Sequence, residues 1–270
     1  MPKYAVITTF HAKGYSQYAQ KFIQTFLKAW PADVLLYAYA EDCQVLETAP
    51  NLIVRDLHGS CPDLVNFKAK WKNVPKANGD VSADPVRSQR KDAGKGFKWD
   101  AVRFSHKVYS IFHCAKNCDA EILIWMDADM ICHSPISMLQ LDSLIPADKD
   151  LCFLGREGKF SECGLYTMKL GTKMTDLFLS RFQQMYDQAE QGIFRLDEWH
   201  DSYVFDQVRR SMQLNELNWT EGLIKGEGHP LINGPWGAFL DHLKGTRKQE
   251  GKSRPTDLIV NRQESYWTAH

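Results

Sequence analysis

Two carboxylates stand close together in the middle of the chain, directly after a run of large apolar residues. The run is Ile122-Leu-Ile-Trp-Met126, and Asp127-Ala-Asp129 follows it. Such a run is typical of a buried strand, and where a strand ends its side chains at i and i+2 can turn toward one point. Paired carboxylates repel each other unless a cation lies between them, and hard oxygen ligands suit Mg²⁺ or Mn²⁺. The spacing therefore predicts a divalent metal site at Asp127 and Asp129.

The elements that must position this pair follow an alternating pattern of strands and helices. Apolar and β-branched runs predict strands at 4–10, 33–40, 51–57, 122–126, 150–154 and 163–168. Amphipathic periodicity predicts helices at 15–30, 99–116 and 172–190. Alternation of this kind favours a mainly parallel sheet with helices on both faces, whose ligand crevice lies at the carboxyl ends of the strands.

Length and charge restrict the other possibilities. The 270 residues fit one large α/β domain, which we expect to consist of two closely abutting halves, 1–132 and 133–270. Lys and Arg balance Asp and Glu at 33 each, which gives no indication of a nucleic-acid partner. A stretch at 60–98, rich in Lys, Arg, Pro and Gly, predicts a long surface loop. Its basic residues either hold an anionic substrate or are simply solvated.

The sequence also bears on the location of the protein. It contains no apolar run near the ~20 residues that a membrane span needs, and no secretory signal is recognisable at its start. We therefore expect a cytoplasmic protein without a transmembrane segment, and peripheral membrane association and the oligomeric state stay open. The seven cysteines are expected to be reduced thiols.

The aspartate pair, its strand and the His133-Ser-Pro135 loop together resemble the signature of GT-A glycosyltransferases. The nearest likeness is to the type of glycogenin and the lipopolysaccharide sugar transferases. This resemblance implies a Rossmann-like GT-A fold and a cation, Mn²⁺ or Mg²⁺, that bridges Asp127 and Asp129 to the diphosphate of a nucleotide-sugar donor. By the same analogy the donor is a UDP-hexose, and the acceptor is a hydroxyl group, typically on a glycan.

A later segment resembles the part of that family that completes the metal site. Asp241-His-Leu-Lys-Gly-Thr-Arg-Lys248 is similar to a His-x-x-Gly-x-x-Lys pattern, although the spacing differs by one extra basic residue. The resemblance implies that His242 is the third metal ligand and that Lys244, Arg247 and Lys248 contact the diphosphate. His229 is a competing ligand.

Three other groups of residues occupy places where the family binds its nucleotide. They are the first-strand residues Thr8, Thr9 and Phe10, the acids Glu41 and Asp42 after the second strand, and the helical residues Arg103 and Lys107. For catalysis the resemblance points to Glu162, in Ser161-Glu-Cys-Gly164, and to Asp201. A retaining or an inverting mechanism is equally compatible with the sequence.

Other classes of protein share parts of this pattern. A phosphohydrolase of the haloacid dehalogenase type also uses Asp-x-Asp, but places it on the first strand. A sugar nucleotidyltransferase needs a glycine-rich, arginine-containing loop after the first strand, which Thr8 to Tyr15 does not supply. A non-catalytic protein of the same fold that binds carbohydrate or nucleotide sugar stays open, because the Cys163-Gly164 strand departs from the catalytic family.

Overall fold

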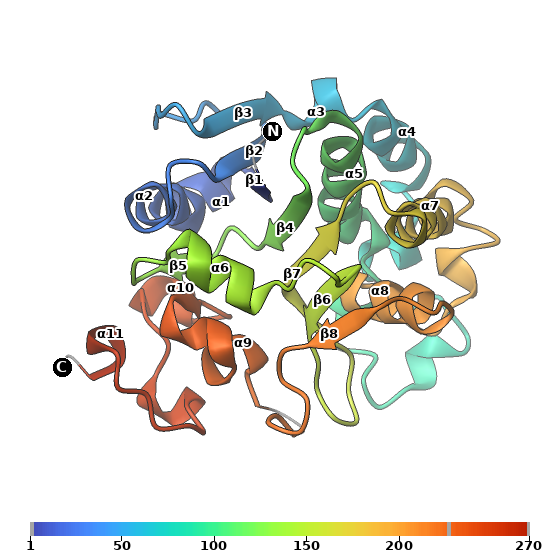
Figure 1. The fold of residues 1–270 in the computed structure, drawn as a ribbon. Helices are drawn as coiled ribbons and strands as arrows, with labels where there is room; N and C mark the ends of the chain where they lie inside the picture. The colour runs from blue at the N-terminus through green and yellow to red at the C-terminus, as the bar shows by residue number, and fades with distance from the viewer. Residues whose placement is uncertain (1–2, 226–227, 269–270) are drawn as a thin grey trace.

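A seven-stranded sheet runs through the centre of the computed structural model, which describes residues 3–225 and 228–268 (Figure 1). The strands lie in the order β3-β2-β1-β4-β7-β6-β8. Their bounds are β1 Tyr4–His11, β2 Leu35–Glu41, β3 Leu52–Asp56, β4 Ile122–Met126, β6 Leu151–Leu154, β7 Glu162–Lys169 and β8 Glu216–Asn218. Every neighbouring pair is parallel except those that include β7, which runs against both β4 and β6. The predicted α/β class, with a mixed and mainly parallel sheet, is confirmed.

Helices cover both faces of the sheet because successive side chains of each strand point to opposite sides. On one face, Ile7 and Leu123 pack beneath α4 (Pro62–Trp71), α5 (Ala101–Asn117), α7 (Lys173–Asp187) and α8 (Asp201–Arg210). On the other face, Val6 and Ile124 pack beneath α2 (Gln20–Ala29), α6 (Met138–Leu144) and α9 (Pro230–Asn233). The short helix α1 (Ala12–Gly14) and a π-helical turn at Tyr15–Ala19 lead into α2.

The segment 60–98 is more ordered than the sequence predicted. The helix α3 (Leu57–Ser60) ends where the segment begins, α4 occupies its first part, and 3₁₀ turns at Pro75–Asn78, Arg87–Gln89 and Gly96–Trp99 follow. The prediction of a long loop was therefore wrong for Pro62–Trp71. Pro62 starts α4 at a position where its missing N–H costs nothing. Leu64 and Phe67 are buried against the core, while Lys70 is exposed.

A second, two-stranded sheet brings distant parts of the chain together. β5 (Met130–Cys132) pairs antiparallel with β9 (Leu240–His242), and Thr25 on α2 accepts a hydrogen bond from the backbone N–H of Cys132 at 3.2 Å. The short helices α10 (Arg247–Glu250) and α11 (Ser265–Thr268) follow β9. The main sheet contains strands from both predicted halves of the chain: β1, β2, β3 and β4 come from 1–132, and β6, β7 and β8 come from 133–270.

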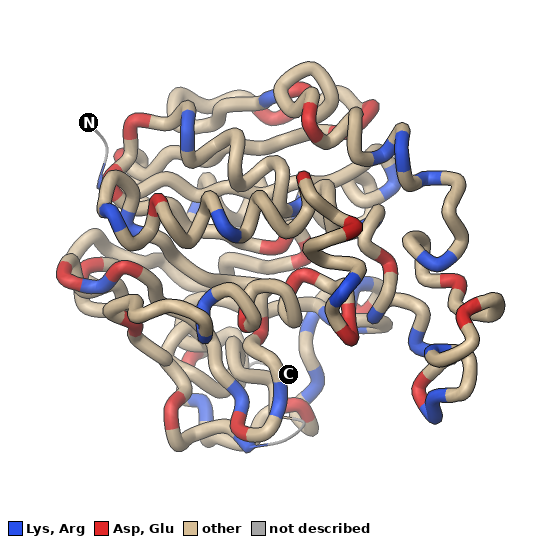
Figure 2. The backbone as a smooth tube through the Cα atoms, turned by 90° about the vertical axis from the view of Figure 1, so that its right-hand side faces the viewer, with Lys and Arg blue, Asp and Glu red and all other residues tan. Residues whose placement is uncertain are grey.

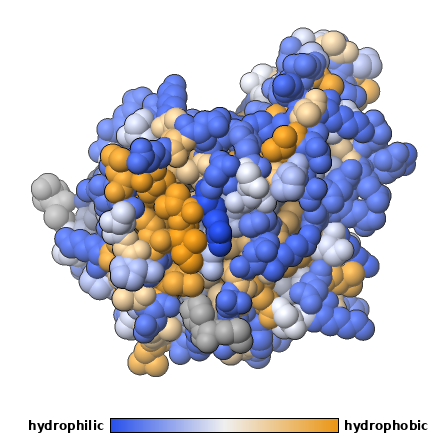
Figure 3. Space-filling view, turned by 90° about the horizontal axis from the view of Figure 1, so that it is seen from above, coloured by the Kyte–Doolittle hydropathy of each residue, from blue (hydrophilic) through white to orange (hydrophobic). Residues whose placement is uncertain are grey.

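The surface carries mixed charges. In Figure 2 basic and acidic residues are interspersed along the backbone of the side that faces the viewer. Figure 3 looks down on the β3 edge, where hydrophobic residues gather on one side of a mostly hydrophilic face. β3 itself ends the sheet, and Val54 on it is 43% exposed.

Within residues 3–225 and 228–268, we find no helix with the length and apolar character of a membrane span.

Candidate metal and nucleotide site

Asp127 and Asp129 lie at the carboxyl end of β4, where the apolar run stops. The backbone N–H of Asp127 donates to the carbonyl of Gly164 on β7 at 2.8 Å, which continues the pairing of the two strands. The indole N–H of Trp125 donates to Oδ1 of Asp127, also at 2.8 Å. The central strand and its neighbour thus fix the direction of the first carboxylate.

The third predicted ligand reaches the same point through the two-stranded sheet. His242 on β9 is paired with Met130 on β5, directly after Asp129. Its Nε2 lies 3.1 Å from Oδ1 of Asp129 and 3.6 Å from Oδ2 of Asp127. One ligand atom from each of the three side chains lies within 4.8 Å of the other two. The competing candidate, His229, lies outside this group and contacts the ring and carbonyl of His242 instead.

The surroundings of His242 fit a metal-binding imidazole. Its Nδ1 is buried and has no hydrogen-bond partner within the described residues, and Oε1 of Glu162 lies 3.9 Å behind it. Metal-binding histidines commonly direct their second nitrogen toward a carboxylate in this way. A Cβ at Gly164 would lie only 2.5 Å from Cε1 of His242, so glycine makes the room that the ring occupies. Two carboxylates and an imidazole are a donor set that suits Mn²⁺.

Basic side chains offset the charge of the aspartates. Lys248 lies 2.7 Å from Oδ2 of Asp129, and Lys107 lies 3.2 Å from Oδ1 of Asp127. Burial by itself would raise the pKa of Asp129, but His242 and Lys248 outweigh it and hold that pKa far below its usual value. The site therefore keeps Asp129 ionised, as metal binding requires.

Lys107 joins the aspartate pair to the predicted catalytic residue. Its ammonium lies 2.7 Å from Oδ2 of Asp201, at the first turn of α8, and also donates to the carbonyl of Cys163. The side chains of Lys107 and Asp201 are 9% and 10% exposed. The sequence singled out both residues, but it contained no signal that they form one ion pair.

A pocket of about 380 Å³ opens above these groups. It is lined by most of the residues predicted to contact metal or nucleotide, namely Thr9, Phe10, Glu41, Arg103, Lys107, Asp127, Asp129 and Lys248. Tyr18, Phe104, His106 and Trp125 also line it and were not predicted. Their helical and strand positions resemble ordinary core positions in the sequence, which is why pattern alone could not identify them.

Other predicted residues lie outside this pocket. Thr8 is fully buried in the strand, and Asp42, with φ = 52°, faces a separate hollow beside β3. Arg247 is paired with Asp257. Glu162 is buried and paired with Lys244, and neither of these two side chains lines the candidate nucleotide pocket above the aspartates.

Glu41 is the acidic centre of one wall of the pocket. Its Oε1 accepts from Lys68 at 2.7 Å and lies 3.2 Å from Nε2 of His58, and its Oε2 lies 2.9 Å from Nδ1 of His106. Burial favours a higher pKa, but hydrogen bonds from His106 and Lys68 prevail and lower the pKa of Glu41 to about 2. Glu41 is therefore anionic at neutral pH and holds the two histidines in place.

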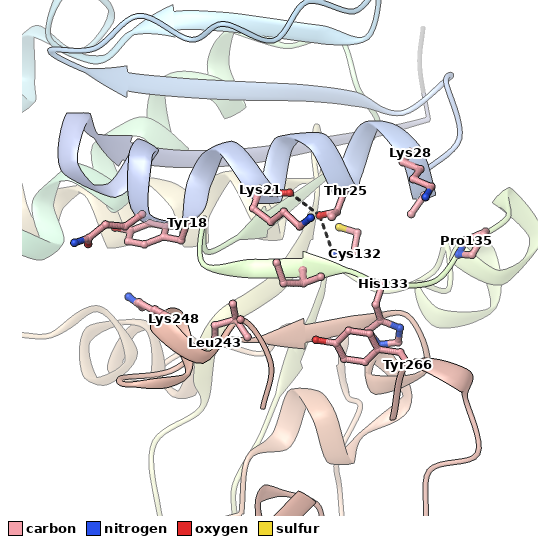
Figure 4. A pocket seen from close by; sticks show the side chains of 14 residues that line it. Tyr18, Lys21, Thr25, Lys28, Cys132, His133, Pro135, Leu243, Lys248 and Tyr266 are labelled. Atoms are coloured by element: carbon pink, nitrogen blue, oxygen red, sulfur yellow. Dashed lines mark hydrogen bonds between the residues drawn. The ribbon is translucent and has the colours of Figure 1, made fainter. Parts of the chain in front are cut away.

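A second pocket, of about 400 Å³, lies between α2 and the segment that follows β9 (Figure 4). Tyr18 and Lys248 stand at one end of it and also line the candidate nucleotide pocket. His133 and Tyr266 stand at the other end, with their rings stacked at 4.0 Å. Lys248 is thus shared by two adjacent hollows.

Comparison with known proteins gives similarity in structure only. No protein-family model matches the chain, and no curated protein matches its sequence. The bifunctional glycosyltransferase WbbM is similar over 81% of this chain and 39% of its own, with 7% identity and a TM-score of 0.46. GlyE of Streptococcus pneumoniae is similar over 81% and 45%, with 9% identity and a TM-score of 0.43. The galactosyltransferase LgtC is similar over 80% and 73%, with 9% identity and a TM-score of 0.45.

These solved structures are glycosyltransferases, and the likeness is one of fold. The chain spans less than half the length of the first two.

Proposed function

We propose that the protein is a metal-dependent glycosyltransferase that moves a sugar, typically a hexose, from a UDP-sugar donor to a hydroxyl group of a carbohydrate acceptor. One observation carries the proposal: ligand atoms of Asp127, Asp129 and His242 lie within 4.8 Å of one another, and the two aspartates line a pocket. The two aspartates and the histidine come from segments 113 residues apart, so the chain folds back to complete the group. The resemblance to GT-A enzymes implied that His242 lies beside Asp127 and Asp129.

Asp127, Asp129 and His242 would hold Mn²⁺ or Mg²⁺. When bound, the cation would supply positive charge for the donor diphosphate. Lys248 lies next to the same carboxylates and Arg103 lines the pocket, so both are placed to bind phosphate oxygens. Thr9, Phe10 and Glu41 line the pocket at the ends of β1 and β2, where we place the base and ribose.

The chain's own residues would then position the reacting groups. Lys107 pairs with both Asp127 and Asp201, and we assign Asp201 the task of orienting the acceptor hydroxyl. Glu162 lies behind His242 and pairs with Lys244. We assign Glu162 the task of holding His242 in place, and we retain Asp201 as the candidate catalytic residue.

A thermal-shift experiment with UDP tests the proposal. A ligand that binds only the native state raises the melting temperature, so UDP with Mn²⁺ should raise it in the native protein, whereas UDP alone should do so much less. The double variant Asp127→Asn/Asp129→Asn should lose the Mn²⁺-dependent shift. Asp63→Asn/Asp176→Asn, which changes two acids in the first turns of α4 and α7, is the matched control.

Donor turnover is then measured with the same samples. Release of UDP from UDP-glucose or UDP-galactose that depends on Mn²⁺ and on Asp127 and Asp129 supports the transferase. Tight binding without any turnover of either donor would instead favour the carbohydrate-binding alternative. An unchanged shift in the Asp127→Asn/Asp129→Asn variant would refute the metal site itself.

A further inference from the structure

Another hollow, of about 730 Å³, lies next to the nucleotide pocket and has no part in the function proposed so far. It forms between the end of segment 60–98, the turn after β6 and the start and end of α8. Its volume lies within the range of ordinary ligand pockets. The sequence left open whether the basic residues of 60–98 hold an anionic substrate, and Lys95 and Lys98 from that segment line this hollow.

Its wall is strongly basic. Of the described residues that line it, five are Lys or Arg and one, Glu198, is acidic. The acid is already neutralised within the wall, since Oε1 of Glu198 accepts from Lys98 at 2.7 Å and its Oε2 lies 2.9 Å from Nε2 of His200. Glu198 therefore does not cancel the charge of the remaining basic side chains.

Two of these basic side chains have no acidic partner. Within residues 3–225 and 228–268, neither Lys95 nor Arg156 has a carboxylate within ion-pair distance. Arg156 is nevertheless held in place, because its Nε donates to the carbonyl of Phe160 at 2.9 Å. This bond leaves the two terminal nitrogens of the guanidinium to bind an anion from the pocket, and such a fork matches the geometry of a carboxylate or phosphate.

Aromatic rings line the same hollow. Phe97 is 48% exposed, and its ring and that of Phe160 both contact the ring of His200, with centroids 6.0 and 5.4 Å away. An exposed aromatic ring beside polar groups suits the apolar face of a sugar. Basic groups and aromatic rings together favour an acidic carbohydrate over a simple inorganic anion.

The hollow shares a wall with the nucleotide pocket. Phe104 lines the nucleotide pocket, and its ring centroid lies 6.1 Å from that of His200, which lines the basic hollow. The residue after His200 is Asp201, which pairs with Lys107 beside the metal group. His200, which lines the basic hollow, is thus the residue directly before the candidate catalytic Asp201 in the chain.

We propose that this hollow binds the anionic group of the acceptor, and that the acceptor is an acidic carbohydrate bearing a carboxylate or a phosphate. Arg156 and Lys95 bind the anionic group, and Phe97 and Phe160 pack against the sugar. This inference rests on the proposed transferase function and names the class of its acceptor.

The test compares three sugars that share one skeleton: cellobiose, its C6 carboxylate (cellobiouronic acid) and its 6-phosphate. Each is titrated into the full chain without donor or metal, and binding is followed by protein-observed NMR. At low salt we expect at least one acidic sugar to bind roughly tenfold more tightly than cellobiose, as a charge-assisted contact allows. The preference should shrink as salt screens the charges. The tighter of the two acidic sugars identifies the preferred anionic group.

Variants locate the binding. Lys95→Gln/Arg156→Gln should reduce acidic-sugar binding to the level of cellobiose and leave cellobiose unaffected. Lys91→Gln/Arg181→Gln removes the same charge from two exposed positions outside the hollow and should change neither. If the loss of Arg156 disturbs folding, Lys95→Gln alone should still weaken acidic-sugar binding several-fold, because Lys95 is exposed and its side chain forms no hydrogen bond or ion pair with the described residues.

Two results would overturn the inference: equal binding of all three sugars, or an equal loss in the Lys91→Gln/Arg181→Gln control. UDP with Mn²⁺ is titrated into the same samples. If the native protein binds UDP with Mn²⁺ but shows no preference for acidic sugars, only the acceptor inference fails. If the native protein does not bind UDP with Mn²⁺, the proposed transferase function fails.

Discussion

Lys107 is the buried cation on which two carboxylates of the site depend. It pairs with Asp127 and Asp201, and its ammonium lies 4.6 Å from the centre of the Trp125 ring. Removing one member of a buried ion pair leaves an uncompensated charge, which is far more costly than removing both members. The environment of Lys107 therefore predicts an effect on stability that is separate from any effect on activity.

Replacing Lys107 with Met should lower the free energy of unfolding by about 3–5 kcal/mol, as measured by urea denaturation. Lys107→Met/Asp201→Asn should recover part of this loss, because it removes one of the unpaired charges. Lys116→Met, on the exposed end of the same helix, should change stability by less than about 0.5 kcal/mol. A loss in Lys107→Met no larger than that of Lys116→Met would contradict the buried network.

Gly164 provides a second prediction at this scale. In Gly164→Ala the new methyl group would lie 2.5 Å from the His242 ring, so the imidazole must shift from its present position beside the aspartates. We expect Mn²⁺ affinity to fall by about 10- to 100-fold, the range typical of disturbed supporting groups around a metal. Gly94→Ala, where a Cβ meets no atom within 4 Å, is the control. Titration with Mn²⁺ followed by thermal shift measures both variants, and equal affinities would show that His242 is not a ligand.

At the scale of elements, α4 packs against the core through only one of its faces. Phe67 is 5% exposed and its ring contacts those of Trp71, Tyr109 and Tyr186, whereas Val65 on the same helix is 43% exposed. Phe67→Ala should cost about 3–5 kcal/mol of stability, and Val65→Ala less than about 0.5 kcal/mol. Urea denaturation measures both, and similar values would mean that 62–71 does not pack as a helix against α5 and α7.

The same elements show what the sequence could predict. β1, β2, β4 and α5 matched their predicted positions closely because their apolar residues repeat at the period of a strand or a helix. α4 was missed because its lysines and few buried residues give only weak helical periodicity. β9 spans just three residues, Leu240–His242, so its pairing with β5 depends on a distant partner that no local pattern records. The resemblance placed His242 near the aspartates. The Lys107–Asp201 ion pair and the space that Gly164 leaves for the His242 ring are visible only in the structure.

At the scale of the whole molecule, the segment that follows β9 closes over the two-stranded sheet. Tyr266 donates to Oδ2 of Asp241 at 2.8 Å, Trp267 donates to the carbonyl of Gly237 at 2.7 Å, and the His133 ring stacks on Tyr266. Burial lowers the pKa of His133 to about 4, from an ordinary value of 6.5. The folded protein therefore favours neutral His133.

This shift predicts a loss of stability in mild acid. Because the folded-state pKa is the lower one, the unfolded chain binds the proton first, so the contribution of His133 is complete above pH 6.5 and is lost as the pH falls to about 4. His133→Gln should flatten the pH dependence of the melting temperature in that window. Identical slopes for the native protein and the variant between pH 6.5 and 4 would contradict it.

The separation of Asp129 from His242 also has a consequence for the order in which the site forms during synthesis. Lys107 and Trp125 precede Asp127 in the chain, so the first carboxylate meets its partners as soon as β4 joins the sheet. Asp129 must wait for 113 further residues before His242 can pair with it. If the chain folds as it is synthesised, Asp127 would be paired before Asp129, which gains His242 only after β9 leaves the ribosome. The metal-dependent binding of a nucleotide that we propose would then be gained only late in synthesis.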